Sequence, residues 1–322
     1  MTNTNGFVIE TQGLSKSYNG VHALKALNLQ VPKNSIFGFL GPNGSGKSTT
    51  IKLLLGLIRP SGGSGTVFGL DIAQKSPEIR TRVGYLAQDQ RFYGHMTARE
   101  TLRFTAGFFY AGPKAEIENR IDETLELVNL AGKADRPVQG FSGGECQRLG
   151  IAQAQINYPD LMILDEPAAA LDPQGRHDVL MIMERLRKYS TIFFSTHILD
   201  DVQKVSDTVA ILNHGELVAL APIEELLAGS GNVVYTITTK GDGGGIQTRL
   251  SELSWVTDIN RSRVNGGTRW QVIVDDEAAA EAQLLRSVQS DSEITVSEFG
   301  RKKFELEEIF LKIIEESNHD GN

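Results

Sequence analysis

The sequence predicts an α/β protein built around a mostly parallel sheet. Three short apolar runs, 161–164, 191–194 and 208–212, lack polar–apolar alternation, as expected of strands covered on both faces. A helical pattern over 173–188 separates the first two runs and gives a β-α-β unit. A glycine-rich turn near residue 41 joins another apolar run to a helical pattern, which indicates the same architecture.

The elements that precede these runs form a second, antiparallel part. Residues 8–17 and 26–31 have the pattern of half-exposed strands, and we expect them to pair antiparallel. Residues 35–40 form a continuous apolar run and predict a buried strand. The helix after the glycine turn is expected over residues 47–57, and a further strand over residues 83–87.

A helical subdomain is predicted at about residues 89–157, inserted between strands of the sheet. Its clearest signal is one apolar stripe, in which Ile117, Ile121, Leu125 and Val128 lie at i, i+4, i+8 and i+11. Residues 1–224 are therefore predicted as one cassette made of a parallel sheet, an antiparallel β subdomain and this helical part.

Residues 225–322 predict a small α+β accessory domain. Four strand patterns alternate with helical stretches near 246–253 and 277–288, which gives the order β-α-β-β-α-β of ferredoxin-like domains. A final amphipathic helix is expected over 304–316. The expected strands cover residues 233–239, 256–262, 270–274 and 294–297.

Composition excludes several classes of protein. The 322 residues carry 32 basic and 40 acidic side chains, a net charge of −8, which argues against nucleic-acid binding. Residues 225–322 hold 10 basic and 17 acidic side chains, so most of the negative charge lies there. The single cysteine cannot form an internal disulfide. No run approaches the roughly 20 apolar residues that span a bilayer, so any role at a membrane requires a partner.

A phosphate-binding motif, the P-loop, spans residues 41–48. GPNGSGKS matches G-x-x-x-x-G-K-[ST] and stands between a predicted strand and a predicted helix, as the motif requires. Glycines allow backbone N–H groups to turn toward phosphate oxygens, and the helix N-terminus adds its positive dipole end. Lys47 is expected to reach the β- and γ-phosphates, and Ser48 to bind Mg²⁺. The predicted nucleotide-binding residues of this loop are Gly41, Pro42, Asn43, Gly44, Ser45, Gly46, Lys47, Ser48 and Thr49.

Two adjacent carboxylates follow the buried strand at 161–164. Asp165 stands at the carboxyl end of this strand, where ligands bind in open α/β sheets, and can hold the Mg²⁺ shell. Glu166 follows at a position from which a base could polarise an attacking water. Alone, this pair would be an acidic turn, but together with the glycine loop it predicts ATP hydrolysis.

With both motifs in place, the chain resembles the ATP-binding subunit of ABC transporters. The distinguishing feature is Phe141-Ser-Gly-Gly-Glu145, about twenty residues before Asp165, which is similar to the signature LSGGQ. Phe141 stands for Leu and Glu145 for Gln. The resemblance covers residues 7–222 and implies the P-loop NTPase fold of the ABC cassette. Ser142 and Glu145 also fit a capping box, so the segment can serve simply as a helix start.

The resemblance implies roles for single residues. Tyr18 is similar to the aromatic residue that stacks on adenine, and Gln88 to the glutamine that contacts Mg²⁺ and the attacking water. His197 resembles the switch histidine that contacts the γ-phosphate. A structural tyrosine, a loop glutamine and a structural histidine are the alternatives.

A dimer is implied by the same resemblance. In the family, the signature of one subunit faces ATP bound to the other, so two ATP molecules are held in a head-to-tail sandwich of two copies or of paralogous cassettes. Asp172 matches the D-loop residue, although it would also cap a helix. The residues expected to act across the dimer are Ser142, Gly143, Gly144, Glu145 and Asp172.

The expected function is therefore ATP hydrolysis that energises a separate membrane permease, with ATP and Mg²⁺ as cofactors. Glu166, His197 and Gln88 are the expected catalytic residues, and Ser48, Gln88 and Asp165 the expected Mg²⁺ ligands. The permease would hold the chain at the cytoplasmic face of the cell membrane. Six aromatic side chains are candidates for lining its docking groove, although packing inside the helical subdomain is an alternative for half of them: Phe92, Tyr93, Phe104, Phe108, Phe109 and Tyr110.

Export is the expected direction of transport. The segment FELEEIFL at 304–311 resembles the C-terminal extension of ATPases that are paired with ABC-2-type permeases, which mostly export their substrates. An importer ATPase with a regulatory C-terminal domain is the alternative. A soluble ABC-type ATPase acting on DNA or ribosomes is disfavoured by the acidic balance and the single cassette.

Overall fold

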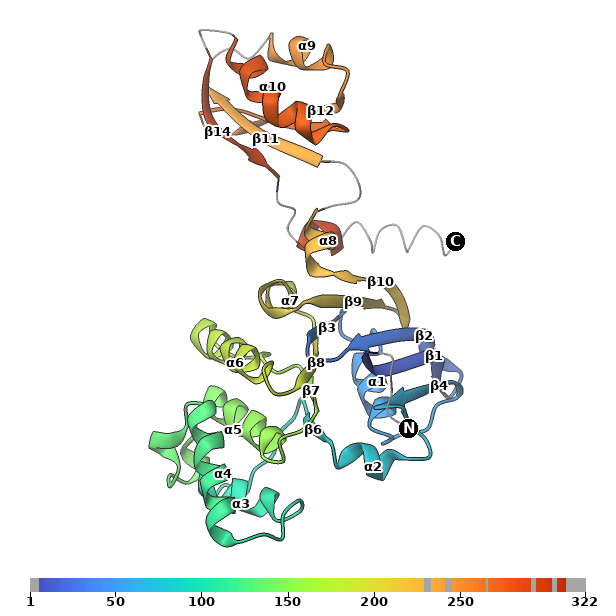
Figure 1. The fold of residues 1–322 in the computed structure, drawn as a ribbon, viewed down its shortest axis with the longest axis vertical. Helices are drawn as coiled ribbons and strands as arrows, with labels where there is room; N and C mark the ends of the chain where they lie inside the picture. Colours follow the sequence, from blue (N-terminus) through green and yellow to red (C-terminus); the bar gives the residue numbers. More distant parts are fainter. Residues whose placement is uncertain are drawn as a thin grey trace. The chain divides into compact units, whose positions relative to one another are not determined.

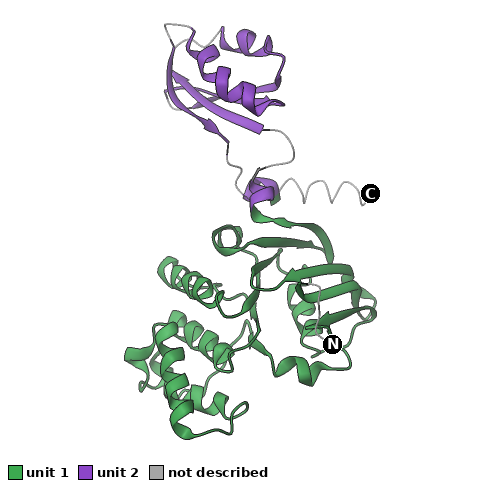
Figure 2. Cartoon of the chain, viewed as in Figure 1, with its two compact units in different colours: residues 1–223, 310–322 green, residues 224–309 purple. Residues whose placement is uncertain are grey.

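The computed structural model describes residues 6–228, 233–240, 245–264, 266–290, 294–302 and 306–310. Two compact units divide the chain: unit 1 comprises residues 1–223 and 310–322, and unit 2 comprises residues 224–309 (Figure 2). No helix within these described stretches is long and apolar enough to cross a bilayer.

A six-stranded sheet forms the centre of unit 1 (Figure 1). Its order is β10-β9-β3-β8-β7-β6, and every pair is parallel except that of the edge strand β10 with β9. Every residue of β3, β7 and β8 is buried, which explains why their sequences do not alternate. The strands are β3 (Ile36–Leu40), β6 (Val83–Leu86), β7 (Leu161–Asp165), β8 (Thr191–Thr196), β9 (Thr208–Asn213) and β10 (Glu216–Pro222).

A second, antiparallel sheet has the order β2-β1-β4-β5. The first two strands form a hairpin whose two turn residues, Asn19 and Gly20, have φ of 47° and 85°. Positive φ at both positions is the geometry of the turns that match the twist of paired strands. The bounds are β1 (Phe7–Tyr18), β2 (Val21–Pro32), β4 (Gly62–Val67) and β5 (Leu70–Asp71).

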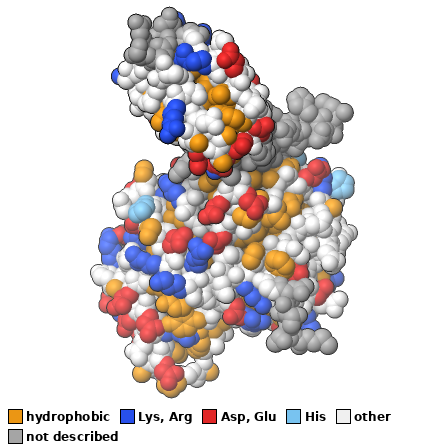
Figure 3. All heavy atoms as spheres, turned by 45° about the horizontal axis from the view of Figure 1, so that its top comes forward, with side chains coloured by type: hydrophobic (Ala, Val, Ile, Leu, Met, Phe, Trp, Pro, Cys, Tyr) orange, Lys and Arg blue, Asp and Glu red, His pale blue; other side chains and the backbone are white. Residues whose placement is uncertain are grey.

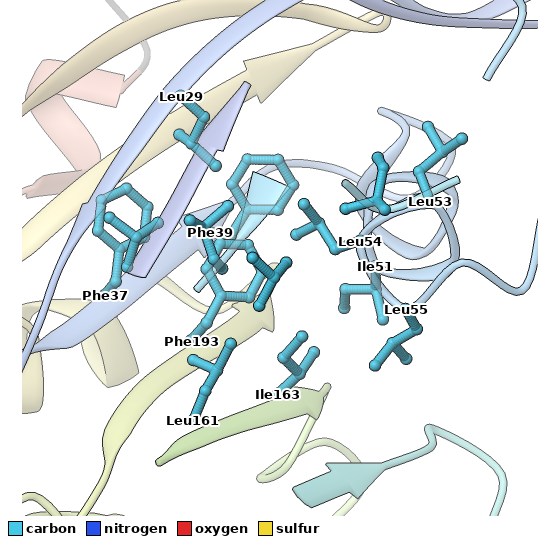
Figure 4. Close-up of a cluster of buried hydrophobic side chains, with 14 of the residues drawn as sticks. Leu29, Phe37, Phe39, Ile51, Leu53, Leu54, Leu55, Leu161, Ile163 and Phe193 are labelled. Atoms are coloured by element: carbon cyan, nitrogen blue, oxygen red, sulfur yellow. The ribbon is translucent and has the colours of Figure 1, made fainter. Parts of the chain in front are cut away.

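The hydrophobic core of unit 1 lies between these two sheets and helix α1 (Lys47–Leu54) (Figure 4). At its centre the rings of Phe37 and Phe193 stack with centroids 5.7 Å apart, and Phe39 packs against Phe193 at 5.2 Å. Helix α1 is three residues shorter than the span expected from the sequence. It stops because Gly56 takes a left-handed φ of 63°, a common helix-ending conformation.

The helical subdomain packs against strand β6. Gly84 in β6 is required there, because a Cβ at this position would lie 2.0 Å from the carbonyl oxygen of Ala154 in α5. On α4 the expected apolar stripe is buried at Ile121 and Leu125, while Ile117 is only half-buried. The helices of the subdomain are α3 (Ala98–Ala106), α4 (Lys114–Leu127) and α5 (Gly143–Gln155), with 3₁₀ turns η1 (Ala131–Lys133) and η2 (Val138–Gly140).

Three further helices of unit 1 connect strands. Helix α2 (Ser76–Arg80) leads from the antiparallel sheet to the central sheet, and α6 (Pro173–Leu186) and α7 (Leu199–Val205) connect strands of the central sheet.

Acidic and basic side chains are interspersed over the face of the molecule that Figure 3 shows, in keeping with the near-balanced charge of residues 1–224.

Unit 2 holds a four-stranded antiparallel sheet of order β12-β13-β11-β14, which two helices cover on one face. Trp270 lies at the centre of its core and is 1% exposed. Of the expected last helix over 304–316, residues 306–310 are helical and the rest lies outside the described residues. The elements are α8 (Ile223–Ala228), β11 (Val233–Lys240), α9 (Ile246–Ser251), β12 (Val256–Val264), β13 (Gly267–Val274), α10 (Glu277–Gln289) and β14 (Thr295–Arg301).

The buried indole of Trp270 provides a test of unit 2. Its Nε1 donates to Thr239 Oγ1 at 3.0 Å, so Thr239→Val leaves this N–H without an acceptor. We expect the free energy of unfolding of unit 2 to fall by about 1–3 kcal/mol. Both tryptophans of the chain, Trp255 and Trp270, lie in unit 2, so urea unfolding followed by tryptophan fluorescence reports this unit. Thr239→Ser keeps the hydroxyl as a control, and equal losses in the two variants would contradict the assignment.

Candidate active site

A cavity of about 330 Å³ lies over the glycine loop between β3 and α1. Strand β3 ends at Leu40 and α1 begins at Lys47, so the motif predicted from the sequence forms the turn between them. The cavity therefore opens at the carboxyl ends of the parallel strands, where open α/β sheets bind their ligands. It is lined by Ala23, Asn43, Gly44, Gly46, Lys47, Ser48, Thr49, Gln88 and Glu166.

Two positions of the loop require glycine, because neighbouring backbone atoms leave no room for a Cβ and because one of the two has a positive φ. A Cβ on Gly41 would lie 2.4 Å from the carbonyl oxygen of Leu212, and one on Gly46 2.5 Å from that of Ala23. Gly46 also has φ of 107° and caps α1 without a side-chain hydrogen bond. The first N–H groups of the helix thus have no side-chain cap, which makes this end suited to an anion.

The ammonium of Lys47 is folded back onto its own loop. Its Nζ donates to the carbonyl oxygens of Gly41 at 2.6 Å and Pro42 at 3.2 Å, and lies 3.4 Å from Glu166 Oε1. Lys47 and Glu166 are both buried. Since an unpaired buried charge is costly, each of the two groups compensates the other.

Glu166 contacts Lys47, His197 and Ser195, which come from two separate segments of the chain. Its Oε1 faces Lys47, and its Oε2 lies 2.9 Å from His197 Nδ1. Its backbone has φ of 52°, a left-handed conformation that costs energy for a residue with a side chain and is typical of functional sites. The N–H of Glu166 donates to both the carbonyl and the hydroxyl oxygen of Ser195, at 3.1 Å each. The carboxylate is therefore held at a fixed place above the P-loop.

Asp165 is held by the neighbouring strand. The parallel register pairs Asp165 with Ser195, whose Oγ donates to Asp165 Oδ1. Ser195 was not among the residues predicted from the sequence, although its place at the end of a strand expected in the same sheet was a usable signal. Gln88 lines the cavity from the loop after β6, whereas Tyr18, at the end of β1, is 42% exposed and is not among the lining residues.

The signature segment and Asp172 begin two helices. Ser142 caps α5 in a capping box, with Glu145 N donating to Ser142 Oγ at 3.3 Å and Ser142 N to Glu145 Oε2 at 2.9 Å. Asp172 caps α6 by accepting from Gly175 N at 2.7 Å. In the part of the chain that the structure describes, neither Asp172 nor residues 142–145 line the cavity of the same copy.

An ion pair between α6 and α7, with a buried carboxylate, was not predicted from the sequence either. Arg176, one turn into α6, donates to Asp201 of α7, and Asp201 is almost completely buried. Burial raises the pKa of Asp201, while Arg176 acts in the opposite direction. The pair ties the helix that begins at Asp172 to the helix that follows His197.

Comparisons with known proteins agree with this geometry. A family model described as ABC transporter matches residues 24–169. The chain is 33% identical to the daunorubicin/doxorubicin resistance ATP-binding protein DrrA of Streptomyces peucetius, over 95% of this chain and 92% of that protein. It is 37% identical to the Nod factor export ATP-binding protein I of Cupriavidus pinatubonensis, over 68% of each chain.

The fold agrees with solved structures as well. The dimeric structure of MJ0796, a bacterial ABC transporter cassette, matches with a TM-score of 0.61 at 25% identity, over 67% of this chain and 98% of that one. The predicted P-loop α/β fold is thus confirmed. The chain belongs to the ABC transporter ATP-binding proteins, a family of nucleotide-binding subunits that hydrolyse ATP to drive transport.

Proposed function

We propose that this chain binds ATP with Mg²⁺ in the P-loop cavity, hydrolyses it as a dimer, and thereby drives an export permease. The observation that carries the proposal is the contact of Glu166 with both Lys47 and His197 at the edge of that cavity. A base, a phosphate-binding cation and a second polar group are thereby held together where a γ-phosphate would lie.

Nucleotide binding follows from the loop geometry. We infer that the phosphates occupy the turn of residues 41–46 and the uncapped start of α1, where they replace Glu166 as the partner of Lys47. Thr49 belongs to the same lining. Tyr18 is exposed enough to offer a ring face to adenine, and Lys16 already lies 5.0 Å from the centroid of that ring.

The hydrolytic step is assigned to the residues around Glu166. Once Lys47 turns to a phosphate, Glu166 Oε1 loses its cation and can accept a proton from a water molecule. His197 holds the other carboxylate oxygen, so the base keeps its direction. Gln88 lines the same cavity and can orient the water from the opposite loop.

The residues present fit Mg²⁺. Ser48 and Gln88 line the cavity, and Asp165, which is buried at the end of β7, lies next in the chain to the lining residue Glu166. The available ligands are the hard oxygens that Mg²⁺ prefers. No group of three or more His, Cys, Asp or Glu side chains suited to a metal occurs among the described residues, so phosphates and water would complete the shell. When bound, Mg²⁺ would neutralise charge on the phosphates.

Dimerisation brings the signature to the nucleotide. Ser142, Gly143, Gly144 and Glu145 start a helix away from the cavity of their own copy, and so does Asp172. We therefore assign them to the ATP of a second copy, or of a paralogous cassette. The dimeric cassette found among similar structures supports this arrangement.

A permease is assigned to the groove between α1, β6 and the helical subdomain. A cavity of about 380 Å³ lies there, with Tyr85 and Phe109 in its lining. Tyr93, Phe104 and Phe108 are exposed, and the ring of Phe104 contacts those of Tyr93 and Phe108 edge to face, at 6.2 and 5.3 Å between centroids. Exposed aromatic clusters are typical of interaction surfaces.

Two of the six aromatic candidates are placed differently. Phe92 is half-buried, and Tyr110 is half-buried with Arg120 stacked on its ring at 4.2 Å and its hydroxyl 3.4 Å from the carbonyl oxygen of Ile156. Tyr110 therefore packs within the helical subdomain, and we leave it out of the docking surface.

Two kinds of similarity favour export. The name of one relative states export and that of another states drug resistance. The segment at 304–311 resembles the C-terminal extension of ATPases paired with ABC-2 permeases. We infer export, with the chain held at the cytoplasmic face of the membrane by its permease. Unit 2 is a candidate for regulating or stabilising the dimer.

Glu166→Gln tests the catalytic assignment. The amide keeps the size of the side chain but cannot accept a proton, so we expect ATP binding to persist while steady-state hydrolysis falls by about a hundredfold or more. Nucleotide binding is measured by equilibrium dialysis, and turnover by phosphate release. Glu184→Gln, on the outer part of α6, is the matched control and should hydrolyse normally. Normal turnover in Glu166→Gln would reject the role of Glu166 as the base.

Phe108→Ser tests the docking surface. Phe108 is 72% exposed and packs mainly on Phe104, so the fold and the ATPase rate of the isolated chain should not change. We expect binding of the chain to permease-containing membranes from its source cells, measured by co-sedimentation, to fall about tenfold or more, as for loss of an aromatic anchor. Tyr189→Ser, which changes an equally exposed aromatic that does not line the cavity of the proposed docking groove, is the control. Equal binding of both variants would place the permease elsewhere.

A further inference from the structure

The signature segment carries a carboxylate at an unfavourable place. Glu145 stands where the resembled signature has an uncharged glutamine, and the proposed dimer brings this segment to the triphosphate of a second copy. Two groups of negative charge would then face each other across an interface from which water is largely removed. Like charges repel more strongly as the effective dielectric constant falls, so the negative charge of Glu145 must be balanced by a nearby positive charge.

The balancing positive charge belongs to Lys133, twelve residues before Glu145 in the sequence. Lys133, the last residue of η1, forms an ion pair with Glu145 Oε1, while Glu145 Oε2 accepts from Ser142 N. Both carboxylate oxygens therefore have donors. The side chain of Glu145 is only 10% exposed, whereas that of Lys133 is 43% exposed, so the lysine approaches from the solvent side.

Protonation does not remove the charge of Glu145. The hydrogen bond from Lys133 lowers the pKa of this carboxyl, and the positive charge of Arg136 acts in the same direction. Glu145 is therefore ionised at neutral pH. Its charge is balanced by the neighbouring ammonium.

We propose that Lys133 is a positioning residue for ATP hydrolysis. It neutralises and holds Glu145, so that Ser142 and the backbone N–H groups of Gly143 and Gly144 face the γ-phosphate of the other copy without an opposing charge. This inference rests on the proposed ATP-sandwich dimer.

A role in folding alone predicts different behaviour. An ion pair with a half-exposed lysine contributes little to folding stability, and the capping box survives without Lys133 because Ser142 and Glu145 make it. Removing Lys133 should therefore leave the fold intact and impair the step in which ATP closes the dimer. Removing the charge of Glu145 should then restore that step.

The test measures ATP-dependent dimerisation by size-exclusion chromatography of the full chain in the Glu166→Gln background, which prevents turnover. We expect Lys133→Met to raise the ATP concentration for half-maximal dimer about tenfold. In the double variant Lys133→Met/Glu145→Gln this concentration should return to within about twofold of that of Glu145→Gln alone, because the two residues act on each other. Lys114→Met, which removes an equal charge at the start of α4, is the matched control and should leave it unchanged.

The experiment distinguishes a wrong role for Lys133 from a wrong ATP-sandwich dimer. If the Glu166→Gln parent forms no dimer with ATP, the sandwich dimer is wrong and the role of Lys133 falls with it. If the parent dimerises, two results overturn the inference alone: an unchanged ATP requirement in Lys133→Met, or a double variant as impaired as that single variant. Thermal unfolding midpoints that match the parent confirm that all variants are folded.

Discussion

One buried ion pair, between Lys47 and Glu166, connects the parts of this molecule on which its proposed chemistry depends. Each charge is removed from water, and each would be costly without the other. Lys47 lies on the P-loop, which follows β3, and Glu166 follows β7; both of these strands pair with β8. The sheet register therefore sets the distance between Lys47, the proposed phosphate-binding cation, and Glu166, the proposed base.

The same pair also bears on how the site could work. The ammonium of Lys47 contacts Glu166 and two carbonyl oxygens of its own loop. We propose that a bound phosphate is a stronger partner for Lys47 and that its arrival frees the carboxylate of Glu166 for a water molecule. The base would thus become available when substrate is bound. The left-handed backbone of Glu166 and its two contacts with Ser195 keep the carboxylate in place through this exchange.

Much of this arrangement could be predicted from the sequence, because each motif is local. The P-loop and the acidic pair Asp165-Glu166 at the end of β7 each occupy a few consecutive residues at the ends of strands whose apolar runs are easily recognised. What escaped prediction are contacts between segments distant in sequence: Ser195 with Asp165, Arg176 with Asp201, and Lys133 with Glu145. Which residues meet in these contacts is set by the register of the paired strands and by how the helices pack. The hydrophobic periodicity of the sequence carries no information on either. The early end of α1 was missed for the opposite reason, since one left-handed glycine outweighed several good helix formers.

The exchange of Glu166 for a phosphate as the partner of Lys47 can be observed in a crystal structure of the chain with a non-hydrolysable ATP analogue and Mg²⁺. We expect Lys47 Nζ to leave the Gly41 carbonyl and Glu166 Oε1, now 2.6 and 3.4 Å away, and to contact the β- and γ-phosphates. His197 should still hold Glu166. If a nucleotide occupies the cavity while Lys47 keeps both present contacts, the proposed exchange does not occur.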